Sequence, residues 1–342
     1  MTFRRPLWLI KLTHYEYWTW YLFFLPLAPY WLYLALKNRS FTYFTAVNAC
    51  IPDGGVFGES KNDILEQIQP QYLPISFYVS ARTPFSELTE LIKNKGLSFP
   101  IIAKPDVGGR GYKVLKLNNE SELKAYLSNI NEPFLIQEYV DFEIELGVFY
   151  ARIPDQSKGR VTSVVLKEFL SVTGDGHSTV EALLKDNIRA QFAMSELRPR
   201  IAHLLNEVFP ENVTKIIQPI GNHCLGTKFV NANYLINTQL NEVFDKIAIP
   251  IKGFDYGRFD MRVKSIEDLY EGKNIRIIEL NGVTSEPGHV YDPAYKLWKA
   301  YRDIMQHMKL VADISAVNRK NGQKTTPALQ LLKTSLGYWE NK

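Results

Sequence analysis

The chain has 342 residues but only two cysteines, Cys50 and Cys224, which lie far apart in the sequence. This excludes a disulfide framework and a cysteine-rich zinc site, and it is typical of a reducing compartment. The net charge is only +4 and the basic residues are dispersed, so we expect no nucleic-acid-binding surface. Internal repeats and low-complexity tracts are also lacking. The length is enough for a catalytic domain with extensions and an ample hydrophobic core.

Charged residues are absent from Trp18 to Leu36, a run that is mostly apolar. Its length could just span a bilayer, but Pro26 and Pro29 divide it, and tryptophan and tyrosine occur throughout rather than at two ends. Because basic residues flank both ends, charge favours neither orientation across a membrane. We therefore expect residues 1–40 to lie on the cytoplasmic face of a membrane without crossing it. Burial in the fold, or in an oligomer contact, is the alternative. The flanking basic residues are Arg4, Arg5, Lys11, Lys37 and Arg39.

Two short patterns late in the chain carry groups that can bind a metal ion. Arg258 and Asp260 alternate in one apolar run. Glu279 and Asn281 alternate in the next run, and turn residues around Gly272 allow the two runs to be neighbouring strands. Alternate residues of a strand share a face, so one guanidinium, two carboxylates and one amide would lie together. Such oxygen ligands suit Mg²⁺ that is also held by substrate phosphates, whereas an ordinary solvated strand face is the alternative.

An apolar run that ends at Lys104 leads into a glycine-rich segment. Gly108, Gly109 and Gly111 free the backbone to turn its N–H groups toward an anion, and Lys104 and Arg110 add positive charge. The spacing matches neither a P-loop nor a dinucleotide-binding motif. Because a further apolar run follows, we expect a flap over phosphates between two strands, with a plain turn as the alternative.

A second apolar run, residues 134–138, breaks at an acidic linker and resumes near Glu145. A hinge strand of this kind between two lobes offers backbone groups to the edge of an adenine. An acidic residue just beyond the hinge can hold a ribose hydroxyl.

The order of these features resembles the ATP-grasp superfamily, and specifically its carboxylate–amine ligases such as D-alanine–D-alanine ligase. Residues 167–181 are more similar to the corresponding part of cyanophycin synthetase. The resemblance covers roughly residues 85–312 and implies an α+β (α/β) ATP-grasp fold, in which two lobes clasp ATP. The expected segments are a membrane-associated region (1–40), a reduced N-terminal region (41–84), the ATP-grasp catalytic domain (85–317) and a tail (318–342).

The resemblance also implies how ATP is bound. Lys104 and Lys167 would contact its phosphates, and Glu145 would hold the ribose. Glu143 is a competing candidate for the ribose because this hinge lacks the family's usual glycine. The remaining nucleotide contacts would be Gly108, Gly109, Arg110 and Gly111 in the flap, and Glu138, Tyr139 and Val140 in the hinge.

The same resemblance implies the metal and catalytic residues. Asp260, Glu279 and Asn281 would bind two Mg²⁺ ions, for which Mn²⁺ is a substitute, with Glu279 as the bridge between them. Arg258, with Lys104 and Lys167, would stabilise the negative charge that grows on the transferred phosphoryl group. Two polar segments, 221–228 and 281–289, would meet the substrates. Their candidate contacts are Asn222, His223, Lys228, Ser285 and His289. For Lys228 and His289, a plain loop position without a role in binding is an equally good interpretation.

The implied activity is an ATP-dependent ligase that joins a carboxylate to an amine through an acylphosphate, making an amide or peptide bond at the cytoplasmic membrane face. A kinase of the same fold and a catalytically silent ATP-binding module at a membrane are the alternatives. The expected partners are small-molecule or lipid-linked carboxylates and amines, and a membrane surface through residues 1–40. No nucleic acid is expected, and the oligomeric state stays open.

Overall fold

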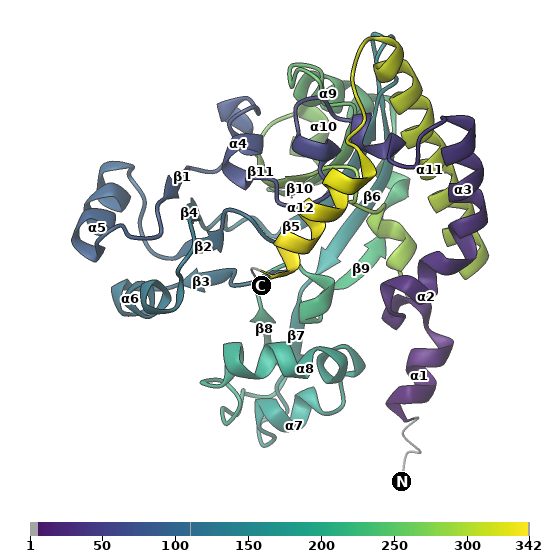
Figure 1. Cartoon of the computed structure of the whole chain (residues 1–342). Helices are drawn as coiled ribbons and strands as arrows, with labels where there is room; N and C mark the ends of the chain where they lie inside the picture. Colours follow the sequence, from purple (N-terminus) through teal and green to yellow (C-terminus); the bar gives the residue numbers. More distant parts are fainter. Residues whose placement is uncertain (1–5, 110, 341–342) are drawn as a thin grey trace.

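The computed structural model describes residues 6–109 and 111–340, so Arg4, Arg5 and Arg110 lie outside the described residues. The first lobe is a four-stranded antiparallel sheet in the order β1-β4-β2-β3, covered by two helices (Figure 1). Leu88 and Ile92 of α5 recur at helical spacing and pack onto the sheet. The elements are β1 (Ser76–Val79), α5 (Phe85–Asn94), β2 (Ile101–Pro105), β3 (Leu115–Leu117), α6 (Glu120–Asn129) and β4 (Phe134–Glu138).

The second lobe is a five-stranded antiparallel sheet in the order β11-β10-β5-β6-β9. Leu240, Phe244 and Ile247 of α9 share one helix face and pack onto this sheet. The short α10 begins at its N-cap Ser265 and ends at Gly272, whose φ is 70°. The elements are β5 (Ile144–Ala151), β6 (Arg160–Glu168), β9 (Lys228–Asn231), α9 (Thr238–Ala248), β10 (Tyr256–Val263), α10 (Ile266–Glu271) and β11 (Ile275–Asn281).

A small subdomain with its own hydrophobic core is inserted between β6 and β9 (Figure 1). Thr179 and Asn187 cap its two helices by accepting hydrogen bonds from the backbone of the first turn. Its elements are β7 (Leu170–Thr173), α7 (Val180–Leu184), α8 (Ile188–Ile201) and β8 (Thr214–Gln218). Strand β4 belongs to the first lobe and β5 to the second, so residues 139–143 form the hinge between the lobes. The expected α+β fold with two lobes is therefore confirmed.

The N-terminal segment folds as short helices, of which α2 and α3 pack against α11, which runs from Leu297 to Lys320 (Figure 1). Phe23 and Leu27 pack with Ile304, and Leu34 packs near Val311. The helices break where Pro26 and Pro29 begin new turns, as the sequence indicates. They are α1 (Leu7–Thr13), η1 (Tyr15–Tyr17), α2 (Trp20–Phe24), η2 (Leu25–Leu27) and α3 (Ala28–Lys37). Across residues 6–109 and 111–340, no helix combines the length and apolar character needed to span a membrane.

Short turns and two further helices connect these parts. The segment between α3 and β1 runs beside β11 and so reaches the space between the lobes. These elements are η3 (Tyr43–Ala46), η4 (Pro52–Gly54), α4 (Lys61–Leu65), η5 (Pro70–Tyr72), η6 (His223–Leu225), η7 (Asn233–Leu235), η8 (Gly288–Tyr291) and α12 (Ala328–Glu340).

Candidate functional site

The two runs that carry the expected metal ligands are neighbouring antiparallel strands, β10 and β11, as predicted. Arg258 is paired with Asn281, and Asp260 is paired with Glu279. The connection between the strands is more than the turn expected around Gly272, because it also contains the helix α10. The pairing therefore places the guanidinium, the two carboxylates and the amide at one end of the strand pair.

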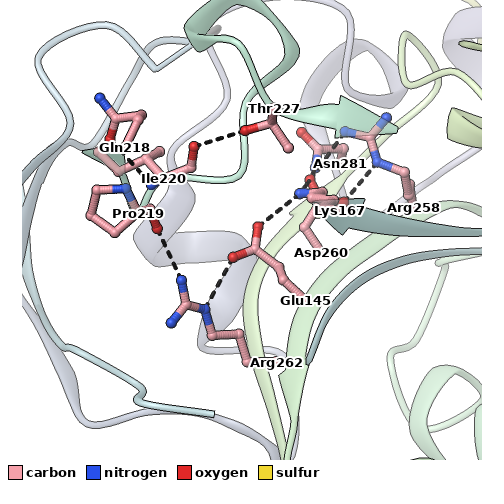
Figure 2. Close-up of polar contacts among 10 residues, drawn as sticks. All are labelled: Glu145, Lys167, Gln218, Pro219, Ile220, Thr227, Arg258, Asp260, Arg262 and Asn281. Atoms are coloured by element: carbon pink, nitrogen blue, oxygen red, sulfur yellow. Dashed lines mark hydrogen bonds and ion pairs between the residues drawn. The ribbon is translucent and has the colours of Figure 1, made fainter. Parts of the chain in front are cut away.

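Asp260 is the centre of a buried charge cluster on the second lobe (Figure 2). Its carboxylate accepts hydrogen bonds of 2.8 and 3.0 Å from Nε and Nη2 of Arg258, and one of 3.2 Å from Nδ2 of Asn281. Nζ of Lys167 lies 3.5 Å away. Burial disfavours the charged form, but Arg258 and Lys167 outweigh it and hold the pKa of Asp260 below its usual value. Asp260 is therefore ionised and fixed in place.

Glu145 is the second buried carboxylate of this cluster, and two cations share it (Figure 2). Lys167 Nζ lies 3.2 Å from its Oε1, and Arg262 Nε lies 3.0 Å from its Oε2. Arg262 also donates to the carbonyl oxygens of Val140 in the hinge, at 2.7 Å, and of Pro219 beyond β8, at 2.9 Å. Lys167 thus connects the Asp260 and Glu145 carboxylates, and Arg262 ties the sheet to the hinge.

Lys104 is buried at the end of β2 and reaches across from the first lobe. Its Nζ donates to Oε1 of Gln137 at 3.1 Å and to the carbonyl of Ile278 at 2.9 Å. Ile278 precedes Glu279 on β11, so the lysine lies beside the expected metal ligands. Burial lowers the pKa of Lys104 to about 8, although the negative charge of Glu279 partly opposes this.

The glycine-rich segment lies between β2 and β3, as expected, and two cations from other parts of the chain hold it. Lys61 Nζ donates to the carbonyl oxygens of Asp106 and Gly108. Arg200 of α8 donates to the carbonyl oxygens of Gly111 and Val114, at 3.0 and 2.7 Å. Neither contact was predicted from the sequence. The flap is therefore anchored to α4 on one side and to the inserted subdomain on the other.

The hinge residues lie where the two sheets meet. The backbone N–H of Glu138 donates to the carbonyl oxygen of Ile75 at 2.7 Å, and the carboxylate of Glu138 accepts a hydrogen bond of 3.1 Å from the backbone N–H of Ile75. Two cations contact the ring of Tyr139, with Lys116 Nζ 3.7 Å and the Arg262 guanidinium carbon 5.3 Å from its centre. Glu143 is exposed, in contrast to the buried Glu145.

The expected substrate-binding residues have different local partners, although β9, which begins at Lys228, contacts η8, which holds His289. His289 is buried, with Nδ1 2.7 Å from Oγ of Ser163 and Nε2 3.2 Å from Asp303. Lys228 forms a partly exposed ion pair of 2.8 Å with Glu168. The other three lie in loops. Asn222 caps η6, His223 lies within η6, and Ser285 donates to the carbonyl of Gly282.

The region before β1 contacts the loop that follows β11, and this contact was not predicted from the sequence. The backbone N–H of Val283 donates to the carbonyl of Gly54 at 3.0 Å. A Cβ added to Gly55 would lie 2.7 Å from the Cα of Gly282, so this contact requires glycine on both sides. Glu59, in the same region, is close enough to Glu279 for its charge to help raise the Glu59 pKa, which burial raises most. Adjacent glycines were a visible signal for such a close approach.

The side chains on β10 and β11 fit a magnesium ion. Along the described ranges, no group of three or more histidine, cysteine or acidic side chains could by itself hold a metal ion. The set is instead two carboxylates, Asp260 and Glu279, with the amide of Asn281. Mg²⁺ is usually bound by one or two carboxylates together with substrate phosphates, so these oxygen donors suit it.

The structure thus has two lobes of antiparallel sheet joined by a hinge, with a buried charge cluster on the second lobe. Residues 73–187 match a family model described as the RimK-like ATP-grasp domain. The chain therefore contains an ATP-grasp domain, and the resemblance noted from its sequence is confirmed.

Solved structures of three enzymes are also similar to this chain. The first is a bifunctional glutathione synthetase from Pasteurella multocida, with 12% identity, a TM-score of 0.38 and a match that covers 71% of this chain and 35% of that one. The second is a D-alanine–D-alanine ligase from Bacillus anthracis, with 16% identity, a TM-score of 0.42 and coverage of 77% of this chain and 69% of that one. The third is a D-Ala:D-Ser ligase from Enterococcus faecalis, with 14% identity, a TM-score of 0.40 and coverage of 71% of this chain and 57% of that one. The match thus spans only about a third of the glutathione synthetase. No curated protein matches the sequence.

Proposed function

We propose that the protein is an ATP-dependent ligase that joins a carboxylate to an amine through an acylphosphate. The strongest support is the cluster of Arg258, Asp260 and Lys167, which lies beside Glu279 and Asn281 on one end of a sheet. Lys104 approaches the same place from the other lobe. Cationic side chains from both lobes would then contact one phosphoryl group. Their charge would stabilise the negative charge that develops on this group during its transfer.

In this proposal ATP lies between the lobes with its adenine against the hinge. The backbone of residues 138–140 would meet the adenine edge, and the flap would cover the phosphates. Lys104 and Lys167 would contact the phosphates. Glu145 already binds two cations, so a ribose hydroxyl would be its third partner, and the exposed Glu143 is the competing ribose ligand.

Asp260, Glu279 and Asn281 would hold magnesium, and we propose two ions with Glu279 between them. Bound there, magnesium would neutralise charge on the phosphates of ATP. Mn²⁺, which accepts the same oxygen ligands, would substitute for it.

The proposed reaction has two steps. An oxygen of the substrate carboxylate attacks the γ-phosphorus, the bond from that phosphorus to the bridging oxygen breaks, and ADP leaves. An amine then attacks the acyl carbon, and the tetrahedral intermediate loses phosphate and a proton to give the amide. Arg258 is held by Asp260 and by the carbonyl of Glu286, at 3.0 Å, so its charge is positioned for the phosphoryl oxygens. The flap would exclude water that would otherwise hydrolyse the acylphosphate.

We also propose that the N-terminal segment docks on the cytoplasmic face of a membrane. Side chains from residues 15–35 of the segment are packed with α11, but several large apolar side chains along the segment are exposed. Lys11 and Lys37 lie beside them and could pair with anionic lipid. An exposed apolar surface of this kind is typical of an interaction site. Its outward side chains are Trp8 (68% exposed), Leu12 (65%), Trp20 (64%), Tyr21 (61%), Leu25 (68%) and Leu36 (62%).

Release of ADP tests the proposed reaction. The purified protein is incubated with Mg²⁺ and ATP, and with pools of carboxylic acids and amines supplied singly and in pairs. A ligase needs an acid together with an amine, whereas a kinase needs one acceptor only. If no combination releases ADP, the protein is a nucleotide-binding module and the proposed function is wrong.

A further inference from the structure

A hollow of about 260 Å³ lies between the N-terminal segment and the inserted subdomain, outside the ATP site. One wall comes from α1 and η1 and the other from α8 and η6. The lining residues that matter here are Lys11, Glu16, Tyr17, Arg189, Phe192 and His223.

A fixed arginine is the central feature of this hollow. The carboxylate of Glu16, which is buried, binds the guanidinium of Arg189 from α8. The guanidinium also lies against the ring of Tyr17, with its central carbon 5.8 Å from the ring centre, and Tyr17 stacks on Phe192 at 4.2 Å. Glu16 and the aromatic rings therefore hold Arg189 in one orientation, so little side-chain entropy is lost when it binds an anion.

The balance of charge in the hollow is positive. Lys11 and Arg189 face a single carboxylate, that of Glu16, which Arg189 already neutralises. Nε2 of His223 is buried and lies 3.7 Å from Glu16 Oε2, too far for a hydrogen bond but close enough for an ion pair when the ring is protonated. Within the described residues this nitrogen has no hydrogen-bond partner. A buried polar atom of that kind is costly unless something binds it.

The hollow is also close to the proposed site of phosphoryl transfer. The ring of His223 lies 5.4 Å from that of Phe229, which in turn lies 6.0 Å from Lys167 Nζ. On the other side, His223 lies 5.9 Å from the ring of Tyr291, whose hydroxyl donates to the carboxylate of Glu286. One aromatic ring therefore separates the hollow from the lysine that the proposed function places on the phosphates.

We propose that the hollow binds the negatively charged, non-reacting end of the acid substrate, a carboxylate or a phosphate. The proposal rests on the ligase function proposed above. The reacting carboxylate would lie near Arg258 and Lys167, the body of the substrate along Phe229 and Tyr291, and the far anion at Arg189 and His223. The N-terminal segment is then one wall of the substrate site, in addition to its contacts with α11.

Isothermal titration with two small anions tests this site directly. The protein is first saturated with Mg²⁺ and the β,γ-imido analogue of ATP, so that the nucleotide site cannot bind added anions. Succinate and inorganic phosphate are then titrated separately, and their relative affinities distinguish a carboxylate from a phosphate as the preferred group. We expect one saturable site, with binding at least tenfold weaker in Arg189→Gln. Absence of saturable binding to the wild type would overturn the proposal.

Arg198→Gln is the matched control, because Arg198 lies on the same helix, carries the same charge and has a side chain that is 56% exposed. Its affinity for the anions should equal that of the wild type, and an equal loss in both variants would overturn the proposal. Since Arg189→Gln leaves Glu16 buried without its partner, the double variant Glu16→Gln/Arg189→Gln provides a neutral pair in case the single variant does not fold. It should also bind the anions at least tenfold more weakly.

The ADP-release assay separates this inference from the proposed function. If an acid and an amine together release ADP but the wild type binds neither anion, the ligase stands and the anion site is wrong. If no substrate releases ADP while anion binding depends on Arg189, the anion site stands and the ligase is wrong.

Discussion

Lys104 of the first lobe donates a hydrogen bond of 2.9 Å to the carbonyl of Ile278 in the second lobe. The hydrogen bond places the ammonium group of Lys104, from the first sheet, beside the strand that bears Glu279. Because the amine is buried, its pKa falls from 10.5 to about 8, close to physiological pH. The protonation of this lysine is therefore a measurable property of the proposed nucleotide site.

The first prediction is that ATP affinity falls as pH rises through 8. A lysine with a lowered pKa is charged below that value and neutral above it, so the charge available to a phosphate disappears between pH 7 and 9. We expect an affinity loss of about tenfold, because the protonated fraction of a group with this pKa falls about tenfold between pH 7 and 9. Calorimetric titration of the nonhydrolysable analogue at both pH values measures it. In Lys104→Arg, whose guanidinium stays charged, the pH dependence should vanish, and an unchanged dependence would exclude Lys104 as its cause.

The second prediction concerns β10 and β11, the pair of strands that carries the proposed metal ligands. Glu279→Gln removes a ligand charge without changing side-chain volume, so ADP release should drop by about two orders of magnitude or more while the fold is retained. Arg258→Lys should be similarly impaired, because an ammonium cannot replace the planar guanidinium. Glu271→Gln, on the exposed end of α10, is the control and should turn over normally. Near-normal turnover by Glu279→Gln would mean that the metal assignment is wrong.

The third prediction separates Glu145 from Glu143. Glu145→Ala removes a carboxylate that Lys167 and Arg262 share, and both cations stay buried. The free energy of unfolding should therefore fall by about 3–5 kcal/mol. Glu143 is exposed, and Glu143→Ala should change stability by no more than about 0.5 kcal/mol. Urea denaturation measures both values.

The ribose contact is measured separately, as the preference for ATP over 2′,3′-dideoxy-ATP in binding experiments. If Glu145 holds the ribose, the conservative variant Glu145→Gln should lose this preference and Glu143→Ala should keep it. The reverse outcome would place the ribose on Glu143.

The strand pair could be predicted because alternation along a strand is a local property. Arg258 and Asp260 share a face wherever the strand lies, and Arg262 continues the same alternation, so it too could have been found. Lys61 and Arg200 could not, because each reaches the flap from a distant segment and only the tertiary fold brings them there. The sequence pattern also cannot distinguish a segment buried on α11 from one that lies on a membrane, since both need apolar side chains.

The fourth prediction is that Gly282→Ala impairs the proposed reaction, although Gly282 lies outside the charge cluster. A Cβ at this position would lie 2.5 Å from the carbonyl oxygen of Gly54, so the loop after β11 must shift. Asn281 is the preceding residue and should be displaced with it. We expect a lower midpoint of thermal unfolding and at least tenfold slower ADP release. Gly337→Ala, where an added Cβ meets nothing within 4 Å, should have the unfolding midpoint and turnover of the wild type.

The last prediction concerns the two sides of the N-terminal segment. Leu34 is only 2% exposed and packs with the α11 side chains, so Leu34→Ala should cost about 2–5 kcal/mol of unfolding free energy and leave membrane binding unchanged. Trp20 and Leu25 are 64% and 68% exposed, so Trp20→Glu/Leu25→Glu should leave stability unchanged. The double variant should sediment with anionic liposomes several-fold less than the wild type, and high salt should release the wild type only partly because apolar burial dominates.

Deleting residues 1–40 should not give the more soluble protein that a simple membrane anchor would. Phe23, Leu27 and Leu34 would be lost from the cores that they share with α11, and the uncovered side chains of Ile304 and Val311 would face water. We therefore expect the truncated chain to be less stable and more prone to aggregate than the full chain. If it is instead as stable as the wild type, the packing against α11 contributes little. If the Trp20→Glu/Leu25→Glu variant sediments with liposomes as the wild type does, the outward side is not a membrane surface.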